Sequence, residues 1–419
     1  MRNSRIHAAL HRFTFYTAVG LLSLGLTACK GGPEVSTALA ENSRVPGDRV
    51  ELGRLIFSDQ SLSEPPGTAC ISCHAASTGL SGNNGSKIGV AQGSKPSSVG
   101  LRNAMTNGYT SYIPAFEFVT EEGATEATGG HFWDGRADSM EQQALGPLLN
   151  PLEMNNPSPK SVLDKIAASP YAALFKQEFG PEIFNHTDAA FAQVGVAIAA
   201  FERGTLQPFS SKYDAMVRGH ATLTHAEARG MALFSDPKGA NCAGCHLMNP
   251  SSGKPEDSLF SEFTYYATGV PRNMAIPRNA NPAFYDLGLC GPERSAPAVP
   301  ATVPAGVTPD QFCGMFRMPT LRNVAQREAF MHNGFFKGLH EVVRFYSSRN
   351  SDPKHWYGPS GAANDLPAQY VKNIETTKAP FNRKAAQGAV LTEAQVSDIV
   401  AFLHTLTDGY SLPATVAAR

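Results

Sequence analysis

The chain has almost no net charge, which limits the partners that its surface can attract. Its 35 lysine and arginine residues are offset by 36 aspartate and glutamate residues, and charged residues make up only 17% of the sequence. Binding to nucleic acid or to an anionic membrane surface depends on an excess of positive charge. We therefore expect no nucleic-acid partner, and contact with a membrane only through an attached lipid.

Long hydrophobic runs are also scarce, and the clearest one lies near the N-terminus. Residues 13–26 are largely apolar and follow Arg2, Arg5 and Arg12. This layout is typical of an export signal, whose apolar core is shorter than the roughly 20 residues that span a membrane. The signal is predicted over residues 1–28, and residues 29–47 are predicted to form a flexible tether.

The signal ends in a sequence that resembles a bacterial lipobox. Leu26-Thr27-Ala28 precede Cys29, which makes Cys29 a candidate for lipidation. Lys30 follows, and the absence of aspartate there favours the outer membrane. Ordinary cleavage near Ala28 is the alternative. Both routes predict export to the periplasm.

A strand pattern, in which apolar and polar residues alternate, is not convincing anywhere in the chain. Capping boxes begin helices at Thr224 and Thr392, and 38 glycines with 30 prolines predict long loops. The 419 residues are enough for two domains. We predict a mostly α, loop-rich fold with domains at residues 48–205 and 206–419.

Cysteine is infrequent, with seven residues, and four of them fall into two matching patterns. These patterns are Cys70-Ile-Ser-Cys73-His74 and Cys242-Ala-Gly-Cys245-His246. C-x-x-C-H attaches a c-type haem, because two thiols bond to the haem and the histidine binds its iron. A zinc ribbon is the alternative, although it does not require histidine after each second cysteine. Both motifs follow a G-x-x-x-F-S-D run, at 53–59 and 230–236, which predicts two cytochrome c-like haem domains.

Cys290 and Cys313 remain once the haem motifs and Cys29 are set aside. They flank a segment rich in proline and alanine at 292–309. In an oxidising compartment the two can pair, and a disulfide closing such a loop contributes roughly 3 kcal/mol to stability. Two unrelated buried thiols are the alternative.

Two further stretches resemble the bacterial di-haem cytochrome c peroxidase and MauG family. The first is Phe132-Trp133-Asp134-Gly135-Arg136 with residues 143–154, and the second is Met318-Pro319-Thr320-Leu321-Arg322-Asn323 with Met331-His332-Asn333-Gly334. The resemblance covers nearly the whole chain after the tether. It implies two covalently bound c-type haems with different tasks.

The resemblance gives the reaction with hydrogen peroxide to the N-terminal haem, whose proximal ligand would be His74. Glu153 would move a proton between the peroxide oxygens, Gln143 would position the peroxide, and Pro147 would leave the sixth iron site open. Trp133 would carry electrons between the haems. Taken alone, Glu153 would be interpreted as a solvated carboxylate and Trp133 as a core residue.

The C-terminal haem, bound through His246, would have a sixth ligand. Many family members use methionine, but the matching position is Tyr346, as in MauG-like members. A phenolate ligand favours ferric iron and lowers the potential. Met315, Met318 and Met331 are rivals whose spacing does not match, and a tyrosine on a helix face is the plain alternative.

Hydrogen-peroxide-reducing members often carry a histidine that blocks the reactive iron, in the loop after the first motif. No histidine lies between His74 and His131, which predicts an open N-terminal iron. Apart from His332, which the resemblance places near the second haem, the remaining histidines are expected to be packing or surface residues.

The family also binds one Ca²⁺ between its domains. Its side-chain ligand maps onto Asn103, and its carbonyl ligands map onto Arg327 and Ala329. Oxygen donors suit this hard cation. The alternative role for Asn103 is that of a turn residue.

Together these features predict a periplasmic di-haem peroxidase. It would use hydrogen peroxide to reach a high-valent di-haem state and then oxidise a partner, such as a protein tryptophan, by long-range electron transfer. One alternative is a cytochrome c peroxidase that reduces peroxide to water with electrons from small c-type cytochromes or another redox protein. A second is a non-catalytic di-haem electron carrier. The loop of Cys290 and Cys313 resembles members linked to copper-binding partners.

Overall fold

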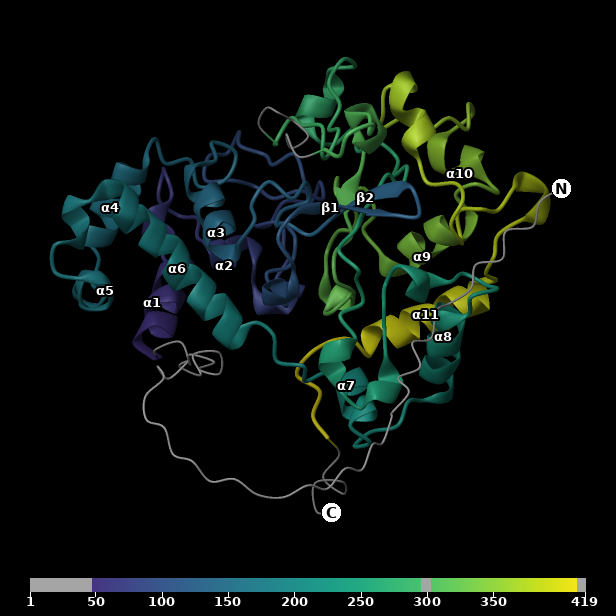
Figure 1. Cartoon of the computed structure of the whole chain (residues 1–419), viewed down its shortest axis with the longest axis horizontal. Helices are drawn as coiled ribbons and strands as arrows, with labels where there is room; N and C mark the ends of the chain where they lie inside the picture. Colours follow the sequence, from purple (N-terminus) through teal and green to yellow (C-terminus); the bar gives the residue numbers. More distant parts are fainter. Residues whose placement is uncertain (1–46, 295–302, 413–419) are drawn as a thin grey trace, which may run out of the picture. The chain divides into compact units, whose positions relative to one another are not determined.

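The computed structural model describes residues 47–294 and 303–412, and helices are its main elements (Figure 1). The N-terminal half contains α1 (Gly47–Ser58), α2 (Cys70–Cys73), α3 (Met140–Leu149), α4 (Pro159–Ala167), α5 (Ala172–Phe179) and α6 (Thr187–Thr205). The C-terminal half contains α7 (Lys212–Val217), α8 (His225–Ser235), α9 (Leu339–Ser348), α10 (Pro353–Tyr357) and α11 (Glu393–His404). The predicted export signal and Cys29 lie outside the described residues. Within those residues, no helix combines the length and apolar content needed to cross a membrane.

One helix crossing occurs in both halves and explains the glycine of the repeated G-x-x-x-F-S-D run. α1 packs across α6, and α8 packs across α11 (Figure 1). A Cβ on Gly53 would lie 2.0 Å from the carbonyl oxygen of Ala197. A Cβ on Gly230 would lie 1.9 Å from that of Asp398. Only glycine lets two helix backbones approach this closely.

The phenylalanine of each run lies beside the histidine of the following haem motif. The ring centroids of Phe57 and His74 are 6.5 Å apart, and those of Phe234 and His246 are also 6.5 Å apart. The repeated run therefore has a structural task in each half. Its glycine allows two helices to cross closely, and its phenylalanine packs beside the histidine of the C-x-x-C-H motif.

Two separate hydrophobic cores surround these two helix pairs. The first core uses buried side chains from Leu52 to Ile198, and the second uses side chains from Tyr213 to Leu406. Burial of apolar surface at about 25 cal/mol per Å² is the main stabilising contribution in both. The predicted domain boundary at residues 205–206 falls between the cores and stays a prediction.

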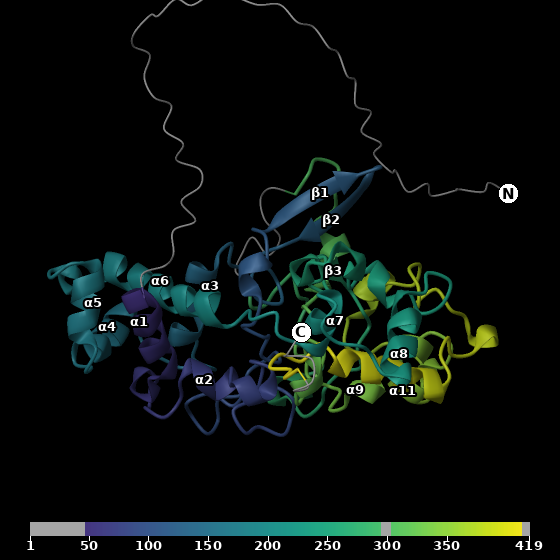
Figure 2. The same cartoon turned by 90° about the horizontal axis from the view of Figure 1, so that it is seen from below.

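The structure contains strands that the sequence pattern did not indicate. β1 (Glu117–Glu121) and β2 (Ala124–Thr128) form an antiparallel hairpin (Figure 2), and β3 (Tyr265–Tyr266) pairs with β4 (Phe316–Arg317). Most side chains of the hairpin are exposed or half-buried, so its residues do not alternate in polarity. Its turn places Glu122 and Gly123 at positive φ. The pairing comes from this turn rather than from a buried face.

Candidate active site

The first haem motif faces a cavity that is open to solvent. Cys70 and Cys73 lie on the single turn of α2, and the backbone N–H of His74 donates to the Cys70 carbonyl at 2.9 Å. This turn holds two thiols and one imidazole on the same wall. That arrangement is the one that haem attachment requires.

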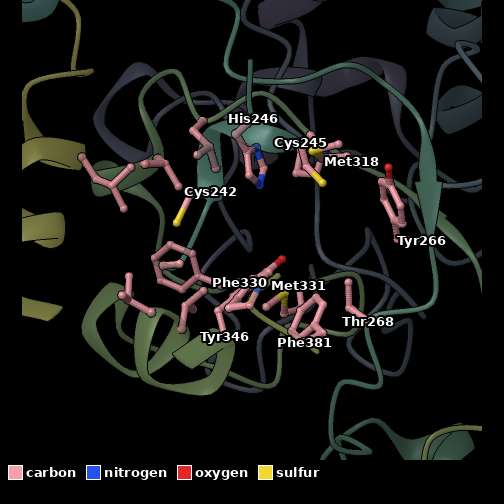
Figure 3. Close-up of a pocket in the computed structure, with 18 of the residues that line it drawn as sticks. Cys242, Cys245, His246, Tyr266, Thr268, Met318, Phe330, Met331, Tyr346 and Phe381 are labelled. Atoms are coloured by element: carbon pink, nitrogen blue, oxygen red, sulfur yellow. The ribbon is translucent and has the colours of Figure 1, made fainter. Parts of the chain in front are cut away.

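The second motif faces another cavity, whose lining is mostly apolar. Its cysteines lie on a 3₁₀ turn, and the backbone N–H of His246 donates to the Cys242 carbonyl at 2.8 Å. Figure 3 shows Cys242, Cys245 and His246 on one side of this cavity. Tyr346 lies on the opposite side.

Both motif histidines are held in the form that binds iron. Nδ1 of His74 lies 2.8 Å from the Leu80 carbonyl oxygen, and Nδ1 of His246 lies 2.8 Å from that of Phe260. A carbonyl only accepts, so Nδ1 carries the proton and Nε2 keeps its lone pair. Burial lowers the pKa of both imidazoles, that of His246 to about 4, and keeps them neutral.

The four motif thiols fit haem attachment better than zinc binding. Burial raises the pKa of Cys70, Cys73 and Cys242 to about 12, and it also raises that of Cys245. A structural zinc site needs several thiolates around one point. No group of three or more His, Cys, Asp or Glu side chains in residues 47–294 and 303–412 could hold a metal ion.

The predicted distal residues line the same cavity as His74. Gln143 and Pro147 come from α3, and Glu153 comes from the turn that follows this helix. The structure therefore brings together three side chains that the family resemblance selected. Pro147 stands inside the helix, where it has no N–H to donate.

The carboxylate of Glu153 is oriented by its own turn. The side-chain amide of Asn150 donates to its Oε1 at 2.7 Å. Burial raises the pKa of Glu153, the positive charge of Arg136 lowers it, and the negative charge of Glu293 raises it. A carboxyl group with a raised pKa is suited to proton transfer near neutral pH.

Trp133 lies in the wall that the two cavities share. It lines both cavities, is 6% exposed, and donates its indole N–H to the Asn103 carbonyl at 2.7 Å. Arg317 also lines both cavities, and its backbone N–H donates to the Trp133 carbonyl at 2.8 Å. An aromatic ring and a cation thus stand between the two haem motifs.

Tyr346 projects from α9 toward the second cavity (Figure 3). Its ring stacks on Phe381, with 5.1 Å between the centroids. Burial raises the pKa of the phenol, which keeps the hydroxyl neutral unless a cation lies beside it. The phenol therefore lines the cavity on the side opposite His246 (Figure 3).

The rival ligands of the second cavity do not share one position. Met318 and Met331 line the cavity, whereas Met315 packs in a separate hydrophobic cluster. His332 lines the cavity too, and its Nε2 lies 3.2 Å from a carboxylate oxygen of Asp365. This contact holds the imidazole against the cavity wall.

Further ionisable side chains line the first cavity although the sequence analysis gave them no role there. Among them are His131, Arg136, Glu202 and Glu293. Burial lowers the pKa of His131 to about 4 and raises that of Glu202 to about 8. His131 and Arg136 flank Trp133 in the sequence, which is a signal that could have identified them. Glu202 and Glu293 carry no such local signal.

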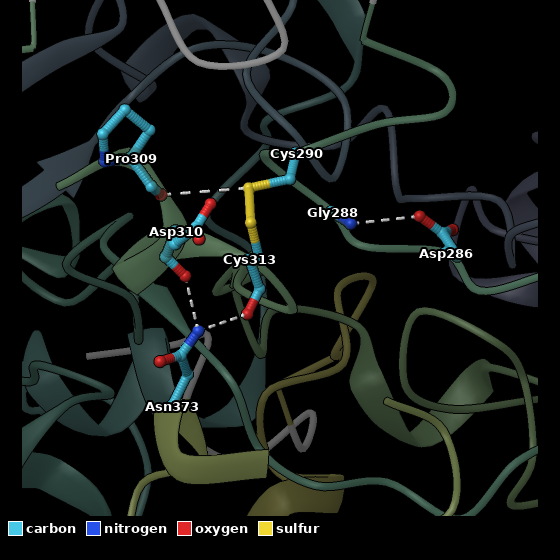
Figure 4. The surroundings of a disulfide bond; sticks show 7 residues. All are labelled: Asp286, Gly288, Cys290, Pro309, Asp310, Cys313 and Asn373. Carbon is cyan, nitrogen blue, oxygen red and sulfur yellow. Dashed lines mark hydrogen bonds between the residues drawn. A yellow bond between two sulfur atoms is a disulfide. The ribbon is translucent and has the colours of Figure 1, made fainter. Parts of the chain in front are cut away.

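Cys290 and Cys313 form a disulfide (Figure 4). The side-chain amide of Asn373 donates to the carbonyl oxygens of Asp310, at 2.8 Å, and Cys313, at 2.9 Å. The base of the loop rich in proline and alanine is therefore closed and anchored. Residues 295–302 of this loop lie outside the described residues.

The predicted calcium ligands come together, but a positive charge accompanies them. Asn103 Nδ2 donates to the Ala329 carbonyl at 2.9 Å, and Asn103 Oδ1 is buried without a hydrogen-bond partner. An unpaired buried oxygen beside a carbonyl fits a hard cation. The guanidinium of Arg327 donates to the same Ala329 carbonyl at 3.4 Å, and its charge opposes cation binding.

Comparisons with known proteins connect this geometry to a family. Residues 47–222 match the family model described as di-haem cytochrome c peroxidase. The chain is 32% identical over 375 residues to the methylamine utilization protein MauG of Paracoccus denitrificans, covering 88% of this chain and 91% of that protein. The chain belongs to the di-haem cytochrome c peroxidase family. It is a peroxidase, and this family membership implies two c-type haems.

Solved structures of di-haem peroxidases share its fold. The diheme peroxidase BthA from Burkholderia thailandensis has a TM-score of 0.78 and 38% identity, covering 86% of each chain. A MauG-like protein associated with microbial copper homeostasis has a TM-score of 0.58 and 27% identity, covering 88% of this chain and 92% of that one. Curated relatives of this peroxidase also include the cytochrome c551 peroxidase of Nitrosomonas europaea.

Proposed function

We propose that this peroxidase is of the MauG-like type, which uses hydrogen peroxide to oxidise a partner with both haems acting together. The observation that carries the proposal is Tyr346, which faces His246 across the second cavity. An oxygen ligand favours oxidised iron, whereas a methionine thioether raises the potential. The similarity to MauG supports this type. The similarity to a cytochrome c551 peroxidase supports the alternative, in which small cytochromes supply electrons.

A haem bonded at each motif would supply the redox chemistry, and the chain's own residues would bind, orient and protonate the peroxide. Reduction of hydrogen peroxide to two water molecules takes up two electrons and two protons. Glu153 takes a proton from one peroxide oxygen and delivers it to the other, a task that contributes about 10²- to 10⁴-fold to a rate. The amide of Gln143 orients the peroxide. Pro147 presents no polar group that would compete with it.

The residues between the two cavities would carry electrons. Trp133 contacts both cavities, so its indole offers a short path for electrons between the two haem motifs. The partner is then oxidised from the side of the second cavity, without entering the peroxide pocket. A protein side chain such as tryptophan suits this long-range reaction.

The open iron at the first cavity is part of the proposal, and His131 provides its sharpest test. His131 lines that cavity and is kept neutral by burial, so it is the histidine that could close the site. We expect the oxidised enzyme to show one high-spin and one low-spin haem by EPR. Two low-spin haems would contradict the open site, and recovery of the high-spin signal in His131→Gln would name the closing ligand.

The peroxide chemistry is tested by Glu153→Gln, with the exposed Glu182→Gln as its matched control. Stopped-flow mixing of the holoenzyme with hydrogen peroxide should show a loss of about 100-fold or more in Glu153→Gln. The control should react like the wild type. An unchanged rate in Glu153→Gln would favour a non-catalytic electron carrier.

The partner is tested by steady-state assays. Rapid peroxide consumption with a reduced small c-type cytochrome, without any protein to be modified, would favour the cytochrome c peroxidase alternative. Slow consumption with that donor, together with oxidation of a tryptophan in a co-exported protein, would support the MauG-like type.

Calcium and location complete the proposal. Ca²⁺ would be held by Asn103 and by the carbonyls of Arg327 and Ala329, weakly because of the Arg327 guanidinium. Metal analysis before and after chelation tests this, and retention of full occupancy in a strong chelator would contradict weak binding. We further propose that the enzyme is periplasmic and anchored through Cys29. Cys29→Ser should then move it from the membrane fraction to the soluble fraction.

A further inference from the structure

The loop closed by the disulfide reaches the cavity of the first haem motif. Glu293, three residues after Cys290, lines that cavity, and its carboxylate lies 3.8 Å from the guanidinium of Arg136. The next residue, Arg294, donates to the backbone carbonyl of Asp134. Two successive residues of the loop are therefore fixed against the segment that carries Trp133.

A chain of ion pairs connects the base of the loop with Arg136, the residue that Glu293 approaches. Asp286 binds the guanidinium of Arg102 at 2.6 and 2.8 Å, and Arg102 binds Asp134 at 2.7 Å. Asp134 in turn binds Arg136 at 2.9 Å. The side chain of Asp134 is fully buried and that of Arg102 is 7% exposed. Charge-assisted bonds shielded from water fix geometry strongly, so the position of Glu293 is determined by the structure around it.

The peroxide reaction creates a need that Glu153 does not meet alone. Each turnover takes up two protons from solvent, and a buried carboxyl group holds only one at a time. Three carboxylates line the first cavity, namely Glu153, Glu202 and Glu293. Glu202 is 2% exposed and accepts a hydrogen bond from Asn107, whereas the side chain of Glu293 is 22% exposed. Glu293 is thus a partly exposed carboxylate on the cavity wall, and the half-buried Glu153, which Asn150 holds, is the neighbour to which it could pass a proton.

We propose that Glu293 is a positioning and relay residue of the peroxide pocket, which passes protons from solvent to Glu153, and that the Cys290–Cys313 disulfide holds it there. The inference rests on the proposed role of Glu153. The transfer is a proton transfer only. A hydronium ion or water gives a proton to Glu293, a water molecule beside Arg136 carries it on, and Glu153 receives it and passes it to the oxygen atom that remains after the O–O bond breaks. Two such transfers complete the second water molecule.

The charges around Glu293 determine how pH should act on the relay. Arg136 faces it, Glu153 is close enough to be affected by its charge, and Asp134 and Asp138 act on Arg294, the next residue along the chain. The negative charge of Glu293 raises the pKa of Glu153. In Glu293→Gln this charge is gone while Arg136 still lowers the pKa of Glu153. The acid limb of the profile of turnover rate against pH should therefore move to lower pH.

The test compares a first turnover with repeated turnover in the holoenzyme. Glu293→Gln should react with the first peroxide at a rate close to that of the wild type, because in that step Glu153 only moves the peroxide's own proton from one oxygen to the other. Repeated turnover with ascorbate as donor should slow by about tenfold, with a larger solvent deuterium effect. Glu293→Asp should restore most of the rate. Asp310→Asn, an exposed acid of the same loop, should behave like the wild type.

The outcomes separate this inference from the proposed function. Wild-type turnover and an unmoved pH profile in Glu293→Gln overturn the relay, provided that Glu153→Gln is inactive. Activity in Glu153→Gln overturns the proposed function instead. The double variant Cys290→Ser/Cys313→Ser should reproduce the slowed turnover of Glu293→Gln, and wild-type turnover in it would overturn the role of the disulfide.

Discussion

The pair formed by Arg322 and Asp214 gives the sharpest stability prediction. Both side chains are fully buried, and Nη1 of Arg322 lies 2.6 and 2.8 Å from the two carboxylate oxygens. The rest of the guanidinium donates to the carbonyls of Ser258 and Pro255. The arginine of the Met-Pro-Thr-Leu-Arg-Asn motif is therefore a structural residue that fixes α7 beneath the second core.

We expect Asp214→Asn to destabilise the holoenzyme by about 3–5 kcal/mol. The cost is large because a buried guanidinium loses the carboxylate that balances its charge, which neither water nor a carbonyl replaces. The carboxylate also accepts from the backbone N–H of Ser211 at 2.8 Å, and that bond survives only if the amide oxygen faces Ser211. For a chain of this size, the loss lowers the melting temperature by roughly 4–6 °C.

Thermal unfolding followed by circular dichroism measures this change. Asp398→Asn is the matched control, because Asp398 pairs with Arg229, whose side chain is 61% exposed. Such a surface pair contributes about 0–1 kcal/mol. Replacing both buried partners, as in Asp214→Leu/Arg322→Met, should recover part of the loss. If Asp214→Asn melts at the same temperature as the surface control, the reasoning about the buried pair is wrong.

Three further predictions concern the cavities. Tyr346→Met should raise the reduction potential of the second haem in a potentiometric titration, and an unchanged potential would exclude Tyr346 as its ligand. Trp133→Phe should keep the first reaction with peroxide but slow electron transfer between the haems in stopped-flow traces; equal rates would remove Trp133 from the path. Burial raises the pKa of Glu202 to about 8, so the folded state favours the protonated carboxyl group. The resulting contribution to folding stability is fully present below pH 4.5. Stability should therefore fall as pH rises from about 5 to 8, and Glu202→Gln should flatten this dependence, which unfolding at several pH values checks.

Some parts of the fold and the site were accessible from sequence because short segments determine them. Each haem motif occupies one turn, so the order of Cys70, Cys73 and His74 already implied one wall of a cavity. The sequence showed that the run with this glycine occurs twice. Only the structure showed that the glycine lies where two helices cross. The distal residues Gln143 and Glu153 were placed by family spacing rather than by any local pattern.

Other parts depended on contacts between distant segments. The hairpin of β1 and β2 is made by a turn, and its exposed side chains leave no alternating pattern. Glu293 lines the first cavity because its loop packs against the distant segment that carries Asp134 and Arg136. His131 was expected to be a packing or surface residue, and whether it faces the cavity or the core depends on backbone pairing with Ala137.

The hydrogen bond of Trp133 has a consequence for the fate of an electron hole. An indole that has lost an electron is a strong N–H acid, and it is trapped as a neutral radical when a base removes its proton. The indole N–H of Trp133 meets the Asn103 backbone carbonyl, which accepts a hydrogen bond but does not take a proton. The oxidised indole therefore keeps its proton and its positive charge. The hole stays mobile and passes on to the haem of one cavity or the other. Electron transfer between the haems should then show almost no solvent deuterium effect, and a large effect would contradict this account of Trp133.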